Sequence, residues 1–319
     1  MNEVAQAQVV ALGEPMIEFN QSRADDPRTW LQGFGGDTSN MVIAAARLGR
    51  SAGVRAGYVT RLGNDAFGRM LRELYAHEGV ATEGVATDAE APTGVYFVSH
   101  GPQGHEFSYL RAGSAASRMS PTTLPLPVLR EARVLHVSGI SQAVSSSACD
   151  ACFTAIDVAR AAGALISYDP NLRLKLWPLA RARAIVRATV ALADWVLPSF
   201  EDAQLLFDGE SPEGVVAALH ALGVRVVVLK LGAEGCLVSD GTRLQRIAGH
   251  RVQAVDATGA GDCFDGAFAV RTLVGDDPFA AAGYANVAAA LATTGYGAVA
   301  PLPDDNAVRE FAAREGALA

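Results

Sequence analysis

The sequence predicts an α/β protein with a central, mostly parallel β-sheet flanked by helices. From residue 121 onward, short apolar or β-branched runs alternate with helical patterns, which is typical of parallel strands buried on both faces. Glycine supplies 32 of the 319 residues, which fits many tight strand-to-helix turns. Hydrophobic residues make up 50% of the chain, enough for a large core.

A strand, a glycine turn and a helix open the chain. Residues 9–12 form a short apolar strand that stops at Gly13-Glu14-Pro15. The glycine pair before Asp37 leads into an amphipathic helix over 38–48. Further along the chain we expect strands at 53–62, 134–137, 165–168, 195–197 and 226–229. We expect a helix that follows the 63–68 turn and ends near 79, and helices at 147–161, 178–192, 200–207 and 212–222. An edge hairpin is expected at 235–239 and 242–247, with closing helices at 262–273 and 278–293.

Two segments interrupt the alternation of strands and helices. The runs TGVYFVS at 93–99 and EFSYLR at 106–111 are rich in β-formers and are joined by a Gly/Pro/Gln/Gly segment, which is typical of a hairpin. Extended apolar residues also occur between 16 and 34. We therefore expect the segments of about 14–34 and 93–112 to form a small β-sheet lid inserted in a single domain of residues 1–319.

Charge and composition exclude several classes of function. A net charge of −8 without a basic run argues against nucleic-acid and membrane-surface partners. Residues 1–10 lack the features of a signal peptide, and no uncharged apolar stretch reaches 18 residues, so we expect a cytoplasmic protein. Four cysteines are too few for a disulfide framework; Cys149-x-x-Cys152 is a redox pair, half of a metal site, or two buried helix residues.

The strongest chemical signal is DATGAGDCFDGAF at 256–268. Gly259, Ala260 and Gly261 stand directly before Asp262 and a helical apolar pattern. Such a loop presents backbone N–H groups to an anion at a helix N-terminus. A carboxylate at this point either takes a proton from a substrate hydroxyl or caps the helix.

This stretch resembles the C-terminal motif of the ribokinase/PfkB sugar-kinase family. GGDTSN at 35–40 resembles the family's N-terminal glycine motif, and Gly63-x-Asp65-x-Phe67-Gly68 matches a third segment. Three ordered motifs between about residues 9 and 301 make the resemblance specific. It implies a ribokinase-like fold, ATP and Mg²⁺ as cofactors, Asp262 as general base, and the N–H groups of Gly259, Ala260 and Gly261 as the anion hole for the γ-phosphate.

The sugar side is predicted from the lid and its neighbours. Arg111 in FSYLR and Arg173 in DPNLR suit a carboxylate, which a guanidinium can bind with two charge-assisted hydrogen bonds. With GGDTSN, TGVYF and KLW, these segments resemble the 2-keto-3-deoxygluconate kinase branch of the family, which phosphorylates the C6 hydroxyl. The resemblance assigns substrate contacts to Gly35, Gly36, Asp37, Asn40, Tyr96, Tyr109, Arg111 and Arg173. Each arginine could instead form a surface charge or a structural ion pair, and the tyrosines could only pack the lid.

The nucleotide side follows from the same resemblance. KLGAEG at 230–235 resembles a family turn that approaches the nucleotide, and Asn286 resembles an adenine-side contact. The nucleotide-side residues implied are Lys230, Gly232, Gly235, Thr258, Gly259, Gly261, Asn286 and Ser199. The family's Asn-x-x-Glu register reads Ser-Phe-Glu-Asp here, so Asp202 is the candidate oxygen ligand of Mg²⁺. The family also allows a monovalent cation near Asp256.

Several alternatives stay open. Another sugar kinase, such as a fructokinase or ribokinase, would not need two arginines, and the galactonate epimer of the keto-acid is not distinguished. A non-catalytic sugar-binding homologue would not need Asp262 with an intact loop. A nicotinamide dehydrogenase would carry GxGxxG after the first strand, which is missing here. We also expect a homo-oligomer, because an exposed lid sheet can pair with a neighbour's.

Overall fold

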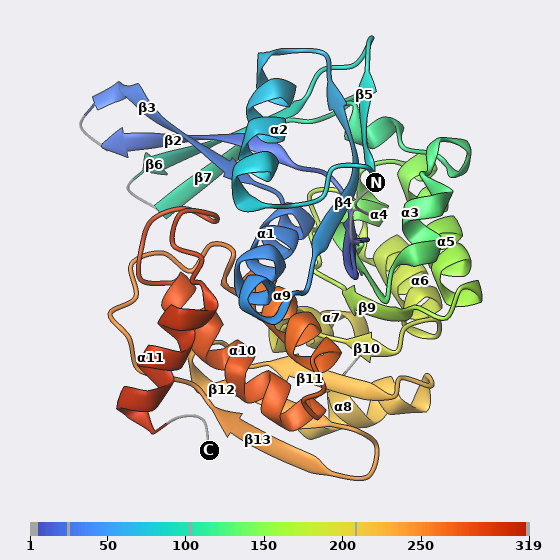
Figure 1. The fold of residues 1–319 in the computed structure, drawn as a ribbon, viewed down its shortest axis with the longest axis vertical. Helices are drawn as coiled ribbons and strands as arrows, with labels where there is room; N and C mark the ends of the chain where they lie inside the picture. The colour runs from blue at the N-terminus through green and yellow to red at the C-terminus, as the bar shows by residue number, and fades with distance from the viewer. Residues whose placement is uncertain (1–5, 24–25, 102–103, 208, 317–319) are drawn as a thin grey trace.

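The computed structural model describes residues 6–23, 26–101, 104–207 and 209–316. A nine-stranded sheet runs through its centre (Figure 1). Across this sheet the strands are β13 (Leu244–Ala248), β12 (Gly235–Ser239), β11 (Val226–Lys230), β10 (Trp195–Val196), β9 (Leu165–Asp169), β8 (Val134–Ser138), β1 (Val9–Leu12), β4 (Ala56–Gly63) and β5 (Val85–Asp88). The pairings from β11 to β5 are parallel, and β12 and β13 form an antiparallel edge. The predicted mostly parallel sheet is confirmed.

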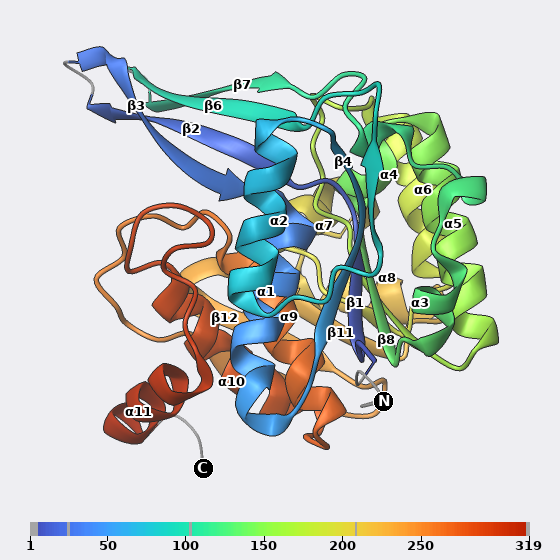
Figure 2. The same cartoon turned by 45° about the horizontal axis from the view of Figure 1, so that its top comes forward.

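Helices cover both faces of this sheet (Figures 1 and 2). On β1, Val9 and Ala11 enter one hydrophobic cluster while Val10 and Leu12 enter the other, as alternating side chains must. The first cluster lies under α1 (Asp37–Gly49), α2 (Ala66–Glu78), α9 (Ala260–Leu273), α10 (Pro278–Ala292) and α11 (Asp305–Glu315). The second lies under α3 (Leu126–Glu131), α5 (Ser146–Ala161), α6 (Leu179–Val190), α7 (Phe200–Phe207) and α8 (Pro212–Ala221). Burial on both faces explains the uninterrupted apolar runs.

The predicted lid segments form a second, smaller sheet that projects from one end of the main one (Figure 2). Its strands are β3 (Asp26–Gly35), β2 (Met16–Arg23), β6 (Gly94–Gly101) and β7 (Gly104–Leu110), in that order. Phe19 stacks on Phe97 at 5.5 Å and meets Phe67 of α2 edge-on at 6.0 Å, which attaches the sheet to the main body. Residues 102 and 103 of the predicted hairpin turn lie outside the described residues.

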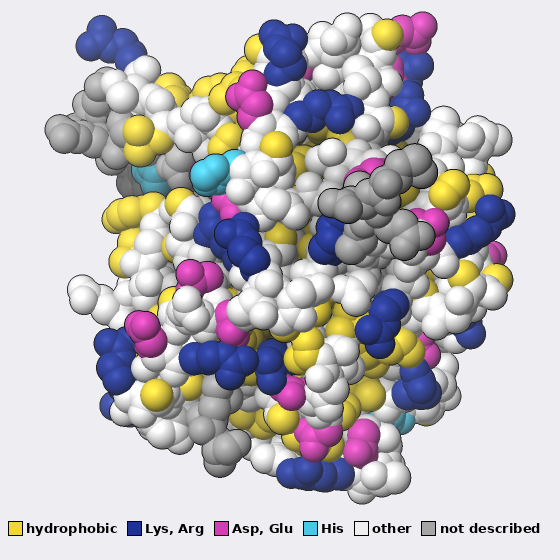
Figure 3. Space-filling view, viewed as in Figure 1, with side chains coloured by type: hydrophobic (Ala, Val, Ile, Leu, Met, Phe, Trp, Pro, Cys, Tyr) yellow, Lys and Arg dark blue, Asp and Glu magenta, His cyan; other side chains and the backbone are white. Residues whose placement is uncertain are grey.

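Some elements were not predicted from the sequence. They are β5, α3, α11 and the short α4 (Gly139–Ala143). Strand β4 begins at Ala56 rather than 53, because a 3₁₀ turn over Arg50–Ala52 ends at Gly53 with a left-handed φ of 70°. Among the described helices, none combines the length and apolar character that a membrane crossing needs. On the face in Figure 3, basic and acidic side chains are interspersed over the surface.

Candidate active site

The predicted site residues gather where parallel strands end and helices begin. Asp169 is the last residue of β9 and Lys230 the last of β11, while Asp37 opens α1 and the 259–262 loop opens α9. Helices α1 and α9 approach closely because Gly266 has no side chain; a Cβ there would lie 2.6 Å from the Met41 carbonyl oxygen. The site thus lies at the carboxyl edge of the sheet, where α/β folds bind ligands.

Asp262 is held by a residue far away in the sequence. Asn40 Nδ2 donates a 2.8 Å hydrogen bond to Asp262 Oδ2. Burial and, next, the negative charge of Asp37 raise the pKa of Asp262 to about 7, although the bond from Asn40 acts the other way. Within the described structure, the buried Oδ1 of Asn40 has no hydrogen-bond partner. A carboxylate with this pKa and an adjacent unmatched acceptor are chemically suited to a substrate hydroxyl.

Asp37 is half-buried among polar groups. Ser138 donates a hydrogen bond to its carboxylate, and Asn171 Nδ2 lies 3.4 Å from Oδ2. Burial raises the pKa of Asp37, and these donors offset only part of that effect. Asp37 therefore adds to the negative charge that acts on Asp262.

The glycine loop has the backbone geometry of an anion site. Gly259 caps α9 with a φ of 79°, and a Cβ there would lie 2.9 Å from the Ala298 carbonyl oxygen. The N–H groups of Gly261 and Asp262 stand in the first turn, where a helix offers no internal acceptor. The Ala260 N–H differs because it donates to Ala257 O at 3.2 Å. Thr258 is bound through its N–H and hydroxyl to Asp256 Oδ1, at 2.9 and 2.7 Å.

Lys230 points under this loop rather than outward. Its Nζ lies 2.9 Å from Asp169 Oδ2 and 3.0 Å from Asp265 Oδ1. Burial alone would lower the pKa of Lys230, but the two carboxylates outweigh it and hold the pKa above its usual range. The lysine predicted at the nucleotide turn is thus engaged by two acids.

On the small sheet, Tyr96 and Tyr109 face each other across β6 and β7. Their rings stack at 5.8 Å, and the Tyr96 hydroxyl donates to the carboxylate of Glu18 on β2. Gly35 gives this tyrosine its space, since a Cβ there would lie 2.3 Å from Tyr96 Oη. Gly36, with a φ of 111°, lies against the Glu14 carbonyl oxygen. Tyr109 is 41% exposed and Tyr96 is buried, so the two are not equally accessible to a substrate.

Arg111 is paired with a buried acid that sequence reasoning missed. Its Nε donates to Glu14 Oε2 at 2.7 Å, and Ser114 donates to the same carboxylate. Nη2 lies within ion-pair distance of Glu14 but outside hydrogen-bond geometry, and it is buried without another described partner. The available signal was an acidic residue directly after a buried strand. Glu14 offsets the charge on which the prediction of a carboxylate site depends.

Arg173 does not join Arg111 in the described structure. Its side chain is exposed, and Nη1 donates to the Leu172 carbonyl at 2.8 Å. The Leu172 N–H in turn donates to Asp202 Oδ2 at 3.0 Å. Asp202 thus keeps Oδ1 without a described protein donor, which fits one carboxylate ligand of a hydrated Mg²⁺. No group of three or more His, Cys, Asp or Glu side chains in the described ranges is arranged to hold a metal ion.

The remaining nucleotide-side residues lie around β11 to β13. Ser199 Oγ accepts the N–H of Asp202 at 3.2 Å and so caps α7. Gly232 and Gly235 have φ values of 58° and 96°, and a Cβ on Gly235 would overlap the Ile247 carbonyl. Asn286 is buried, with Nδ2 3.4 Å from the Ile247 carbonyl oxygen. Their contacts with a nucleotide stay predictions.

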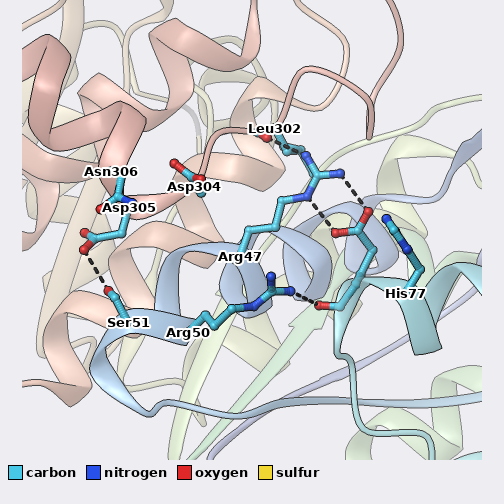
Figure 4. Close-up of a pocket in the computed structure, with 9 residues that line it drawn as sticks. Arg47, Arg50, Ser51, His77, Leu302, Asp304, Asp305 and Asn306 are labelled. Atoms are coloured by element: carbon cyan, nitrogen blue, oxygen red, sulfur yellow. Dashed lines mark hydrogen bonds and ion pairs between the residues drawn. The ribbon is translucent and has the colours of Figure 1, made fainter.

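A separate pocket of about 500 Å³ lies at the other end of α1 (Figure 4). Its main charges are already matched: Arg47 binds both oxygens of Glu78 at 2.7 and 2.8 Å, and Ser51 donates to Asp305 at 2.7 Å. Helix α1 has 13 residues and is therefore roughly 20 Å long, which separates this pocket from Asp262. Its polar groups serve the packing of α1, α2 and α11.

Cys149 and Cys152 are both unpaired and buried in α5. Cys152 belongs to the second hydrophobic cluster, and burial raises the pKa of both thiols. A raised pKa disfavours the thiolate that redox and metal chemistry need. The pair is therefore placed as core residues of the helix.

Comparisons with known proteins give a consistent result. The model of the family described as "pfkB family carbohydrate kinase" matches residues 6–305. A probable fructokinase-4 from Arabidopsis thaliana is 34% identical over 95% of this chain and 96% of its own length; a 2-dehydro-3-deoxygluconokinase from Thermoproteus tenax is 34% identical over 96% and 94%. The structure of a putative ribokinase II from E. coli in complex with ATP and Mg²⁺ superimposes with a TM-score of 0.89, at 28% identity over 97% of this chain and 99% of that one.

Proposed function

Because the chain belongs to the pfkB family of carbohydrate kinases, we propose that it transfers the γ-phosphoryl group of ATP to the 6-hydroxyl of 2-keto-3-deoxygluconate. The observation that carries the choice of a sugar acid is the position of the Arg111 guanidinium, 5.7 Å from the centre of the Tyr109 ring and thus among the residues predicted to contact the substrate. A substrate carboxylate would add a charge-assisted bond to this guanidinium, whose Nε and Nη2 already face Glu14. The Thermoproteus relative with this activity in its name supports the same choice.

The proposed transfer uses the groups at the start of α9. Asp262 takes the proton from the attacking hydroxyl, the sugar oxygen forms a bond to the γ-phosphorus, and the bond to the β–γ bridging oxygen breaks to release ADP. Asn40 orients the carboxylate through its 2.8 Å bond. The N–H groups of Gly259 and Gly261 hold the transferred phosphoryl oxygens as charge shifts.

ATP and Mg²⁺ are proposed as cofactors because a structural relative is recorded with both. When bound, Mg²⁺ offsets the charge of the triphosphate. Asp202 would hold it through the free Oδ1, together with phosphate oxygens and water. This donor set is small, as is usual for a magnesium ion that arrives with its nucleotide.

Fructose is the second candidate substrate. Several relatives at 33–34% identity are named fructokinases, and Glu14 already offsets the charge of Arg111, which a neutral sugar tolerates. The two candidates differ only in the sugar, so the chemistry at Asp262 is common to both. The lid residues decide between them.

A sugar panel tests the proposal. ADP release is measured with saturating ATP and Mg²⁺ for 2-keto-3-deoxygluconate, its galactonate epimer, fructose and ribose. We expect kcat/KM for the keto-acid to exceed that for fructose by roughly 100-fold, since the keto-acid carboxylate can form a charge-assisted bond with Arg111 that fructose lacks. Higher kcat/KM on fructose or ribose would overturn the sugar-acid assignment and leave the family assignment intact.

A further inference from the structure

Lys230 is one of only two lysines in the chain, against 24 arginines. Its side chain is 12% exposed, and those of Asp169 and Asp265 are 7% and 1% exposed. An ammonium group is compact and carries three donors that rotate freely, whereas a guanidinium is a planar fork that pairs best with one carboxylate. A chain that otherwise uses arginine thus has lysine where one cation must serve two acids at short distance.

The three residues belong to three elements of the fold. Asp169 ends β9, Lys230 ends β11, and Asp265 lies in α9 three residues after Asp262. A Cβ on Gly261 would lie 3.4 Å from the Lys230 Nζ, so the ammonium lies directly beneath the glycine loop. The buried ion pair between Lys230 and Asp265 therefore fixes the first turns of α9 against the edge of the sheet.

Asp169 extends this connection toward the sugar side. Its Oδ2 accepts from Lys230, and its Oδ1 accepts the N–H of Asn171 at 3.0 Å. Asn171 has a left-handed φ of 34°, a strained conformation for a residue other than glycine. The same ion-paired carboxylate thus holds the backbone that leads to Arg173 and supports the turn beneath Asp262.

We propose that Lys230 is a positioning residue for phosphoryl transfer: its ammonium fixes the start of α9 and offsets the negative charge around Asp262, and it does not bind the nucleotide. This inference rests on the proposed role of Asp262 as the base, whichever sugar is used. The charged groups facing Asp262 are Asp37 on α1, Asp169 on β9, Lys230 on β11 and Asp265 on α9. Of these four groups, only the carboxylates remain when Lys230 is removed.

The test is the pH profile of kcat/KM for Lys230→Met, measured on the best sugar of the panel. We expect the acidic midpoint to rise by about one pH unit and kcat at pH 7 to fall by about fivefold or more, because an unbalanced negative charge disfavours ionisation of Asp262. The KM for ATP should stay within about twofold. A KM for ATP raised about tenfold or more with an unmoved midpoint would show that Lys230 binds the nucleotide and overturn the proposal.

A double variant separates charge from shape. Lys230→Met combined with Asp169→Asn removes one charge of each sign, so the midpoint should return toward that of the wild type while kcat stays low. A midpoint that does not return would contradict the charge argument. Arg225→Met is the matched control, because Arg225 lies just before β11 at its opposite end and pairs with Asp194 at the surface; its pH profile should be unchanged.

A third variant covers the case in which Lys230→Met does not fold. Lys230→Arg keeps the charge but replaces the ammonium by a larger planar group. We expect the midpoint to stay within about 0.3 pH units and kcat to fall about tenfold, because α9 is displaced. An unchanged kcat would overturn the positioning role. If Asp262→Asn were fully active, the base assignment would fail instead, so the two failures are distinguishable.

Discussion

The start of α9 and the small sheet hold their functional groups in different ways. Asp262 is connected through Asn40 to α1, and its neighbour Asp265 is connected through Lys230 to the central sheet. On the small sheet, by contrast, Tyr109 is 41% exposed and Leu110 68% exposed. One region is fixed by buried charge pairs from distant elements, whereas the other, next to the buried Arg111–Glu14 pair, also presents side chains such as Tyr109 and Leu110 to solvent.

This difference teaches where specificity can change. A buried network of acids and one ammonium tolerates little substitution, because each loss leaves a charge without its partner. Half-exposed lid residues can be exchanged at lower cost in stability. Relatives named for different sugars can therefore share the first region and differ in the second.

The substitution with the largest expected effect is Asp262→Asn, which tests the region at the start of α9. The substitution keeps the size of the side chain and an oxygen that can accept from Asn40, but removes the base. We expect kcat to fall by on the order of 10²–10⁴ while the Kd for ATP changes little. Asp240→Asn, in an exposed turn, is the control. Full activity of Asp262→Asn would mean that the carboxylate only caps α9.

The fold and the glycine loop with Asp262 at the start of α9 could be predicted from the sequence because their signals are local. Buried parallel strands read as apolar runs, and GAGD places a carboxylate at a helix start within four residues. The contact between Asn40 and Asp262 could not be predicted in this way, since 222 positions separate the two residues. The contact of Asn40 with the sugar stays a prediction, while the structure shows its hydrogen bond to Asp262.

Charge partners were the least predictable feature. Lys230 was assigned to the nucleotide from its turn motif, yet its partners come from β9 and α9. Arg111 was assigned to the substrate, yet Glu14, 97 positions away, occupies its Nε. Which acid meets which cation depends on how strand ends pack side by side, and a single sequence does not record that arrangement.

A second prediction concerns the lid half and has a smaller expected effect. Replacing Arg111 alone would leave Glu14 buried without its cation, so the variant to use is Arg111→Ala combined with Glu14→Gln. We expect kcat/KM for the keto-acid to fall about 10- to 100-fold, the value of a charge-assisted hydrogen bond, while that for fructose changes at most about twofold.

The control for this lid variant is Arg118→Ala. Arg118 also lies beside the lid segment but is half-exposed and pairs with Asp88 and Glu90. Its kcat/KM should match that of the wild type on both sugars. An equal loss of kcat/KM on the two sugars in the Arg111 variant would mean that the Arg111–Glu14 pair supports the lid's structure and does not bind the substrate carboxylate.

The smallest expected effect is a dependence of activity on pH. With the pKa of Asp262 raised to about 7, kcat/KM should fall about tenfold for each pH unit below that value, because only the ionised carboxylate accepts a proton.

The contribution of Asp262 to the stability of the fold should change with pH in the opposite direction. A folded pKa above the unfolded value of about 3.9 favours the protonated native state, so this group's contribution to stability is lost as pH rises from about 4 to 7. The melting temperature of Asp262→Asn minus that of the wild type should therefore increase as pH rises from about 4 to 7. A melting-temperature difference that does not change with pH would place the pKa of Asp262 near its ordinary value. The start of α9 would then be no more strongly desolvated than the exposed part of the lid.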